Sequence, residues 1–486
     1  MKEYAAKQPS PWVSVLPLAV LTLLLYVVIR CFGGDAINGG SQIALLSATS
    51  VCVMLAIGIY RCKWAVLEEA IIDNIRASAS AIIILLLIGA IAGSWMVSGV
   101  VPTMIYYGLK ILHPSFFLVA SCAICAGVSL MTGSSWTTIA TIGVALMGIG
   151  QAMGFPEGWI AGAIISGAYF GDKISLLSDT TVLASSTVGV PIFTHIRYML
   201  YTTVPSFVIA LAVFVIAGLT LDHTGGTHAG MYAESLRGTF RITPWLLAVP
   251  VATGVLIVRK LPAIVTLFCA AVFACIAMLL AQPELVAKVA GVGGLDFMSG
   301  FKGVLMSCFG PTAIPTGSPQ LDELVATRGM AGMLNTVWLI ICAMCFGGVM
   351  TGSGMLGALT SVFLRFVRRA FSAVASTVGA GIFFNLCTAD QYISIILSGR
   401  LFRELYAEQG LEPRLLSRSV EDSATVCSVL VPWNSCGMTQ ATVLGVSTFV
   451  YMPYCIFNIV SPLMSLTVAA VGWKIKRAAG SAAHPH

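Results

Sequence analysis

The sequence predicts an all-α polytopic membrane protein with inverted-topology repeats, about ten transmembrane helices, two re-entrant hairpins and two broken helices. Composition gives the first reason. Hydrophobic residues make up 58% of the 486-residue chain and charged residues 9%, whereas about 25% of a soluble domain is charged. The other two reasons are repeated apolar runs of spanning length and a peptide that recurs in both halves of the chain.

Eight apolar runs approach the roughly 20 residues that cross a bilayer. The first lacks a following small-residue cleavage site, so we expect it to remain as a helix and not to be removed as a signal peptide. The runs cover residues 11–30, 42–60, 79–98, 195–218, 243–258, 262–281, 334–352 and 452–473.

Basic residues in short loops and tails orient the chain under the positive-inside rule, which also explains the net charge of +6 without a nucleic-acid partner. They predict a multi-pass protein of the cytoplasmic (inner) membrane with both termini in the cytoplasm. The segments 32–41 and 220–241 then lie outside. The orienting residues are Lys2, Lys7, Arg61, Lys63, Arg259, Lys260, Lys474, Lys476 and Arg477.

Two similar peptides indicate a duplicated half. Residues 93–99 read GSWMVSG and residues 348–354 read GVMTGSG, an offset of 255 (348−93). Weaker matches pair Leu67-Glu68-Glu69 with Leu321-Asp322-Glu323, at offset 254, and Asp172 with Asp422, at offset 250 (422−172). The first copy starts inside and the second outside, so the copies are inverted. The predicted parts are N-terminal helices (1–62), repeat 1 (63–220), a connecting loop with two helices (221–315), repeat 2 (316–475) and a cytoplasmic tail (476–486).

Polar interruptions place the hairpins and the broken helices. Hairpin tips are expected at 132–135, between apolar runs 113–131 and 136–153, and at 389–392. Breaks are expected in GDKISLLSDTT, from Gly171, and in EDSATVCSVLVPWNSCG, from Glu421, where Pro432 cannot continue a helix. Irregular backbone at membrane depth persists only when it is buried in protein or lines a cavity, so these four places predict one midplane site.

The candidate ligands are carboxylates accompanied by neutral oxygens, which suit a hard cation such as sodium. An acid near the bilayer centre costs about 2.5 to 3.5 kcal/mol, so Asp172 and Asp179 are the expected Na⁺ ligands, with Asp179 the deeper and Lys173 neutralising one of them. The predicted ion and substrate site comprises Ser134, Ser135, Thr137, Asp172, Ser175, Ser178, Asp179, Thr180, Asp390, Gln391, Asp422, Thr425 and Asn434.

Simpler interpretations compete with these assignments. Asp172 and Lys173 could cap a helix at the membrane surface, and Asp390 could lie in a solvated turn. Glu421, close to Arg418 at a helix start, is interpreted as an ordinary capping residue. His195 and Arg197 are interpreted as facing lipid headgroups. No catalytic residues and no cofactor are expected, and no Walker motif suggests ATP hydrolysis.

Several motifs together resemble the NhaC-type Na⁺/H⁺ antiporter family of the ion-transporter superfamily, which includes malate/lactate antiporters. They are GDKISLLSDTT, THIR at 194–197, TADQYIS from Thr388 and LSRSVEDSATV followed by PWNSCG. The resemblance spans roughly residues 10–475 and implies an ion-gradient-driven carrier. Ile174, Leu176, Val182 and Ser185 depart from the family pattern, and so do Ser134 and Thr137 at the first tip.

The resulting prediction is an antiporter, not an enzyme, that exchanges Na⁺ for H⁺ by alternating access. Asp390, Asp422 and Asn434 form its second half-site. Na⁺- or H⁺-coupled exchange of small organic acids such as malate and lactate is the alternative, and a homodimer is one expected assembly. A channel is less consistent with inverted repeats that carry paired acids. An intramembrane enzyme is a third alternative, for which the sequence offers no convincing pair of nucleophile and base.

Overall fold

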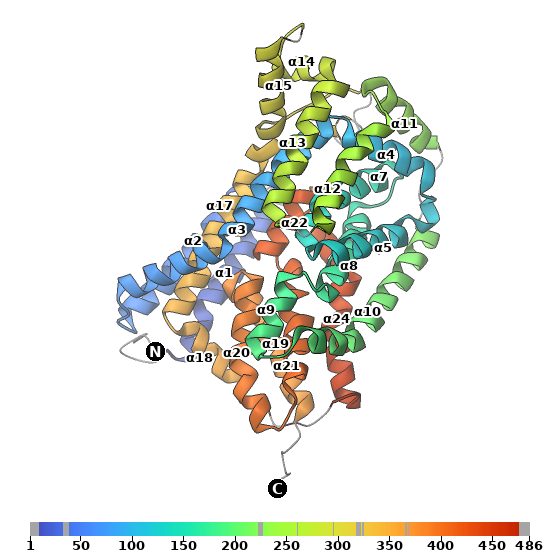
Figure 1. Ribbon diagram of the computed structural model, residues 1–486. Coiled ribbons are helices and arrows are strands. Elements are labelled where there is room, and N and C mark those ends of the chain that lie inside the picture. Colours follow the sequence, from blue (N-terminus) through green and yellow to red (C-terminus); the bar gives the residue numbers. More distant parts are fainter. Residues whose placement is uncertain are drawn as a thin grey trace.

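The computed structural model is built from helices (Figure 1). It describes residues 9–475 except 33–37, 222–226, 260, 295, 317–321, 323–324, 365–366 and 368. Eight helices are long and apolar enough to span a membrane, or up to eleven if each bent pair is one span. The predicted fold class is therefore confirmed. Lys2, Lys7, Lys260, Leu321, Glu323 and the tail from 476 lie outside the described residues.

An antiparallel pair of long helices forms the centre of one half of the molecule. These are α3 (Trp64–Val97) and α17 (Gly329–Gly352); α2 (Gly40–Gly58) packs on α17, and α1 (Pro11–Phe32) packs on α2. A Cβ on Gly348 would lie 2.7 Å from the Ile71 Cα, and one on Gly89 would lie 2.7 Å from the Gly329 carbonyl. Each helix start therefore meets the end of its partner, as inverted repeats require. The pair runs side by side on the left of Figure 1.

The rest of each repeat packs beside this pair. Repeat 1 continues through α4 (Val100–Ile111), α5 (Pro114–Thr132), α6 (Ser135–Thr138), η2 (Ile139–Gly143), α7 (Val144–Ala152), α8 (Glu157–Ile174), α9 (Asp179–Val188) and α10 (Ile192–Thr220). Repeat 2 continues through α18 (Met355–Leu364), α19 (Ala370–Thr388), α20 (Gln391–Glu408), α21 (Pro413–Val420), η4 (Glu421–Thr425), η5 (Ser428–Leu430), α22 (Ser435–Leu444), α23 (Thr448–Tyr451), η6 (Met452–Tyr454) and α24 (Ile456–Val471).

The segment between the repeats contains more helix than expected. It holds α11 (Thr227–Thr239), η3 (Pro244–Leu247), α12 (Ala248–Val258), α13 (Ala263–Ala281), α14 (Pro283–Ala290) and α15 (Phe297–Phe309). Helix α11 lies where the sequence suggested only a loop. Helix α3 also begins at Trp64, earlier than the apolar run at 79, because the charged residues of its first turns continue the same helix.

Backbone geometry sets the register of the two repeats at an offset of 256 from the hairpin tips onward, whereas the left-handed glycines Gly99 and Gly354 keep the offset of 255 (354−99) of the repeated peptide. Gly133 and Ala389 (389−133) both adopt a left-handed conformation at the end of a hairpin arm. The same offset relates the start of α8 at Glu157 to that of α21 at Pro413, the N-caps Ser178 and Asn434, and the C-cap glycines Gly189 and Gly445. Asp172 therefore corresponds to Ser428 (172+256) and Asp422 to Ser166 (422−256). The predicted pairing of Asp172 with Asp422 is wrong.

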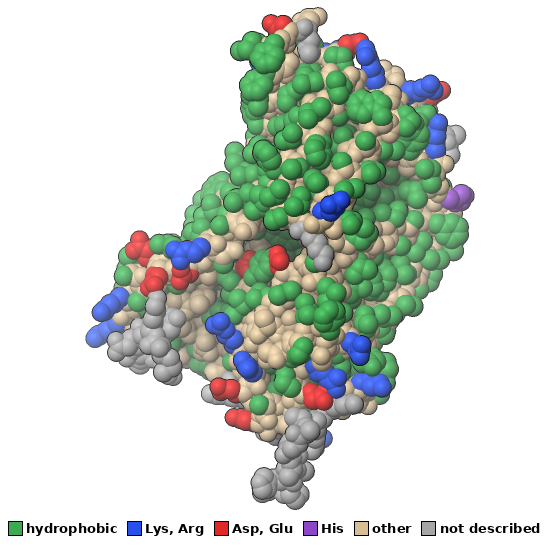
Figure 2. Space-filling view, in the orientation of Figure 1, with side chains coloured by type: hydrophobic (Ala, Val, Ile, Leu, Met, Phe, Trp, Pro, Cys, Tyr) green, Lys and Arg blue, Asp and Glu red, His purple; other side chains and the backbone are tan. Residues whose placement is uncertain are grey.

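The surface is that of a membrane protein. Figure 2 shows apolar side chains over most of the visible face, with most Lys, Arg, Asp and Glu side chains towards its ends and a few near its middle. Large hydrophobic residues such as Leu23, Val208 and Phe268 are exposed, which is favourable against lipid. A hollow near the middle of this face has acidic side chains at its edge (Figure 2).

Candidate functional site

The two hairpin tips have the same hydrogen-bond pattern. At the first tip the Thr132 hydroxyl accepts from the Ser134 amide, donates to the Ser134 carbonyl oxygen and contacts Thr138 Oγ1. At the second, Thr388 makes the corresponding three bonds with Asp390 and Ser394. The tips thus reverse the chain in the same way, although their sequences share little.

Each tip also bonds to the broken helix of its own repeat at the same spacing. The Ser135 amide and hydroxyl donate to Asp172 Oδ2 at 3.0 and 2.7 Å. In repeat 2 the Ser428 hydroxyl donates to Gln391 Oε1 at 3.3 Å. Both pairs lie 37 residues apart (172−135 and 428−391). The geometry is therefore shared by the repeats, but the acid lies in the broken helix of repeat 1, where repeat 2 has a serine.

The breaks bring helix N-termini to this region. Helix α9 starts after the break 175–178 with Ser178 as N-cap, and α8 and α9 are bent by 46°. Helix α22 starts after the break 431–434 with Asn434 as N-cap. Asn434 Oδ1 accepts from the Cys436 amide, while its Nδ2 donates to Asn385. Helix N-termini favour bound anions and ionised carboxylates.

Asp390 is a buried N-cap of α20. Its Oδ1 accepts from the Tyr392 and Ile393 amides at 2.9 and 3.1 Å, and its Oδ2 accepts from the Ser435 hydroxyl at 3.1 Å. With 2% of its surface exposed, Asp390 does not lie in a solvated turn. Three donors and a helix N-terminus stabilise its charge.

The electrostatic environment of one tyrosine that the sequence reasoning missed includes three of the predicted carboxylates. Tyr392 interacts electrostatically with Asp172, Asp179 and Asp390. Asp172 is buried, whereas Asp179 is exposed. Because Asp172 bonds to a hairpin tip inside the protein, it is not a surface cap.

The remaining hydroxyls of the first break mainly organise the backbone. Ser175 donates to the Leu130 carbonyl at the end of α5, and Ser178 bonds Thr180 at 2.9 Å. Thr137 donates to Ser134 Oγ at 3.1 Å. Ser178 and Ser135 are the hydroxyls that face the Asp172 carboxylate. These residues connect the tip, the break and the acid.

A fully buried ion pair joins the two repeats. Lys173 bonds to Asp422, and the Ser461 hydroxyl is 2.9 Å from the Lys173 Nζ. Thr202 also donates to Asp422 Oδ1 at 3.1 Å. Lys173 therefore neutralises an acid of the other repeat, and the expectation that it neutralises Asp172 or Asp179 locally is wrong.

Two further charged residues lie in this region, and the role of one of them, Glu421, was misjudged from sequence. Arg418 and Glu421 are both fully buried. Arg418 Nε lies 3.8 Å from Asp422 Oδ2, and its guanidinium lies 4.9 Å from the centre of the Tyr198 ring. Glu421 begins the π-helical turn η4 and is not a solvated cap. His195 is also buried, with Nδ1 2.9 Å from Ser417 Oγ, so it does not face headgroups.

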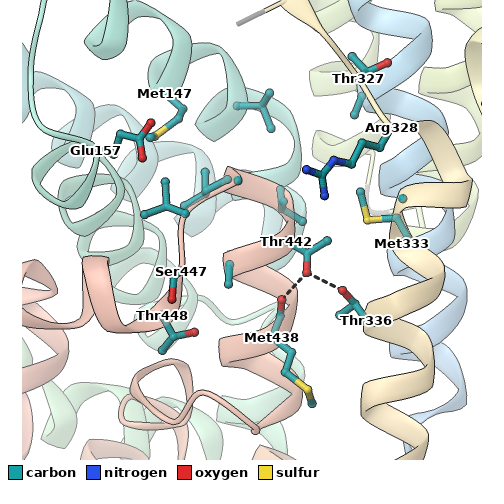
Figure 3. A pocket seen from close by; sticks show the side chains of 18 of the residues that line it. Met147, Glu157, Thr327, Arg328, Met333, Thr336, Met438, Thr442, Ser447 and Thr448 are labelled. Atoms are coloured by element: carbon teal, nitrogen blue, oxygen red, sulfur yellow. Dashed lines mark hydrogen bonds between the residues drawn. The ribbon is translucent and has the colours of Figure 1, made fainter. Parts of the chain in front are cut away.

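A cavity of about 800 Å³ lies apart from these carboxylates, between α7, α17 and α22. Pro432 and Trp433 of the second break line it. Figure 3 shows Glu157 and Arg328 on opposite walls, and a hydrogen bond of 2.6 Å joins Thr336 of α17 to Thr442 of α22. Since an alkali cation needs far less space, the cavity is better interpreted as an access path or a vestibule than as the ion site itself.

Comparison with known proteins identifies the class as membrane antiporters. The model of the Na⁺/H⁺ antiporter family matches residues 167–473. The chain is 35% identical to the Na⁺/H⁺ antiporter NhaC of Alkalihalophilus pseudofirmus, over 87% of this chain and 89% of that protein. This chain belongs to the Na⁺/H⁺ antiporter family, as its motifs suggested.

Relatives named for other substrates are equally similar. The malate-2H⁺/Na⁺-lactate antiporter of Bacillus subtilis is 35% identical, over 85% of each chain. The arginine/ornithine antiporter ArcD of Halobacterium salinarum is 34% identical, over 96% of this chain and 93% of that protein. Overall identity does not separate these substrate classes.

Proposed function

We propose that this protein is a secondary active antiporter that exchanges Na⁺ for H⁺ across the cytoplasmic membrane. One observation carries the proposal: the Asp172 carboxylate is buried where a hairpin tip meets a helix break, and hydroxyls are its nearest partners. A carboxylate with neutral oxygens can bind a hard cation or a proton in turn. The protein needs no cofactor and no catalytic residue for this cycle, and we propose that it is a carrier and not an enzyme.

The two repeats contribute differently to the proposed site. Asp172, Ser135, Ser178 and Thr180 offer oxygens at the first break, and Asp179 lies exposed at the start of α9, where an arriving cation meets it first. On the other side Asp390, Gln391, Thr425 and Asn434 complete the second half-site. Ser134, Thr137 and Ser175 hold the first tip and break in position.

Asp422 has a different proposed role from the other acids. Its carboxylate already binds Lys173, Thr202 and Ser461. These three contacts are to Asp422 Oδ1, and Arg418 Nε lies 3.8 Å from Oδ2. A carboxylate flanked by two basic side chains is a poor site for a further cation. We propose that Asp422 acts as the counter-ion of Lys173 and so fixes the two broken helices to each other.

Alternating access would require the site to open to each side in turn. The cavity reaches the second break, whereas the first break exposes Leu176, Leu177 and Asp179 elsewhere on the molecule. With both termini in the cytoplasm, the cavity faces outward. The breaking and remaking of the contact between Thr336 and Thr442 would accompany the change. The homodimer stays a prediction.

Exchange of a small organic solute is the second candidate, and the cavity favours it. Its volume falls within the range of small-molecule sites, about 300 to 1,000 Å³, and it carries one basic and one acidic side chain on its walls, Arg328 and Glu157. These could pair with the carboxylate of an organic acid or with both charges of an amino acid.

A transport panel in proteoliposomes tests both functions. Purified protein is reconstituted, a proton gradient is imposed, and the flux of H⁺ is recorded on addition of sodium, lithium, potassium, malate, lactate, arginine or ornithine. Among these solutes, we expect only sodium to dissipate the proton gradient. Flux that needs an organic solute would support the second candidate instead, and flux that needs no counter-solute would indicate a channel.

A further inference from the structure

Three sulfur atoms meet beside the turn that follows α17. The Cys52 Sγ of α2 lies 3.6 Å from the Met350 Sδ of α17 and 3.6 Å from the Met355 Sδ of α18. All three side chains are fully buried. One thiol therefore contacts a thioether on each of two other helices, and we call Cys52, Met350 and Met355 the sulfur cluster.

A second thiol borders the same turn. Cys62, which follows α2, is buried, and its Sγ lies 3.9 Å from the carbonyl oxygen of Gly352, the last residue of α17. Gly354 then turns the chain into α18 with a left-handed backbone, at a φ of 74°. Because Arg61 and Lys63 flank Cys62, we expect this end of the helices to face the cytoplasm, where thiols stay reduced.

The donor atoms of the sulfur cluster suit a soft metal ion. Thiolate and thioether sulfur atoms select Cu(I), whereas a hard cation such as Na⁺ prefers oxygen ligands. Sulfur binds zinc at about 2.3 Å, and three ligands around one ion at that distance lie about 4 Å apart. Since the sulfur contacts of Cys52 are 3.6 Å long, a small outward movement of the side chains makes room for an ion.

Charge balance favours a monovalent ion at this place. The Cys52 thiol loses its proton to water when it binds a metal, whereas Met350 and Met355 stay neutral. One thiolate and one monovalent ion together have no net charge (1−1 = 0). A divalent ion would leave one positive charge buried away from water, which is costly. Complete burial of the sulfur cluster is therefore compatible with Cu(I) or Ag(I).

We propose that the sulfur cluster is a binding site for one soft monovalent metal ion, with Cys62 as the first thiol that an ion from the cytoplasm meets. The bound ion bridges α2, α17 and α18 across the turn at Gly354. Helix α18 leads into α19, the first arm of the second hairpin. The ion therefore restrains this hairpin relative to α17 and slows transport. The site is separate from the proposed Na⁺ ligands, and only the effect on transport rests on the proposed exchange.

Selenomethionine labelling of the full-length protein tests the metal ligands directly. With one equivalent of Cu(I), X-ray absorption at the copper edge should show Cu–Se bonds besides Cu–S bonds. The double variant Met350→Leu, Met355→Leu keeps nearly the same side-chain volume. We expect it to lose the Cu–Se bonds and to hold Cu(I) at least tenfold more weakly against bicinchoninate. Met344→Leu is the matched control, since Met344 is a buried methionine of α17 that bonds to Ser78, and it should match the wild type.

A transport measurement tests the restraint on the hairpin. Ag(I) has the ligand preference of Cu(I) and is stable in air, so it is added as the nitrate in chloride-free buffer. We expect one equivalent of Ag(I) to slow the Na⁺-dependent H⁺ flux of wild-type proteoliposomes at least threefold. The flux of the Met350→Leu, Met355→Leu variant should change by less than that of the Met344→Leu control.

The outcomes separate this inference from the proposed function. Bound copper without Cu–Se bonds, or equal Cu(I) affinity of the wild type and the double variant, would overturn the metal site and leave the sulfur cluster as apolar packing. Ag(I) that binds without slowing the flux would overturn the restraint. If the wild type shows no Na⁺-dependent H⁺ flux, the proposed function fails, and Cu–Se bonds would still support the metal site.

Discussion

Replacing Asp422 by Asn should lower the stability of the folded protein. We expect this loss of stability, and not a change in ion binding, to be its main effect. The substitution removes the charge that Lys173 binds and leaves the ammonium group with Ser461 at 2.9 Å and the Phe457 ring at 5.6 Å. Arg418 also loses its only acidic neighbour within 4 Å among the described residues. Loss of one partner of a buried ion pair costs about 3 to 5 kcal/mol in free energy of unfolding.

This loss of stability should lower the amount of protein found in the membrane. At about 1.4 kcal/mol per tenfold change, it shifts the folding equilibrium by roughly 100-fold to a few thousand-fold. We expect little Asp422→Asn protein in membranes and a lower unfolding temperature in detergent, measured by size-exclusion chromatography after heating. The double variant Lys173→Met, Asp422→Leu removes both charges of the Lys173 pair and should recover part of the lost abundance, because apolar residues can replace a buried ion pair. Arg418 still lacks its acidic neighbour in this variant, so recovery should be incomplete.

The opposite pattern would refute this reasoning. If Asp422→Asn accumulates normally, unfolds at the wild-type temperature and has lost exchange, Asp422 binds the transported ion, and its assignment as a counter-ion is wrong. Arg76→Gln, which breaks the exposed ion pair with Asp73, is the control and should change stability by less than about 1 kcal/mol.

Three further predictions follow from local geometry. Ser135→Ala removes one hydrogen bond to Asp172 and should weaken apparent Na⁺ affinity about 10- to 100-fold at normal abundance; degraded protein would instead show that Ser135 is structural. A Cβ on Gly167 would lie 2.0 Å from the Cys122 carbonyl oxygen, whereas a Cβ on Gly127 would meet open space. Gly167→Ala should therefore lower the free energy of unfolding by about 1 to 3 kcal/mol, and Gly127→Ala should be neutral or stabilising. Equal thermal stability of the two variants would contradict this packing. In a background without native cysteines, Glu157→Cys should react with an impermeant reagent from outside and Glu408→Cys from the cytoplasm. Labelling from one side would contradict the inverted orientation.

The architecture was largely predictable because membrane helices follow simple rules. Apolar runs, loop charges and polar interruptions located the crossings, the tips at 132–135 and 389–392 and both broken helices. The register of the repeats was not predictable in the same way. The chemistry at equivalent positions differs, with Asp172 against Ser428 and Ser134 against Asp390, so a search for matching acids paired the wrong residues. Backbone features such as the left-handed Gly133 and Ala389 revealed the correct offset.

The partners of charged residues could not be predicted from neighbours in sequence. Lys173 follows Asp172 directly but pairs with Asp422, because consecutive helical residues point in different directions. Glu421 looked like a cap beside Arg418. One signal could have identified it: Ser417 and Ala424 place small residues on one face of this helix and Ser419 and Ser423 on another, which is typical of close packing against neighbouring helices.

Competition between Na⁺ and H⁺ at Asp172 is the claim most worth testing directly. The decisive measurement is the sodium concentration that gives half-maximal H⁺ flux in proteoliposomes, determined across a pH series for the wild type and for the Asp172→Asn variant. For one shared site this concentration should rise as pH falls, approaching about tenfold per pH unit once the site is mostly protonated. Asp172→Asn should abolish the flux. A half-maximal concentration that does not change with pH, or near-normal flux in Asp172→Asn, would contradict exchange at this carboxylate.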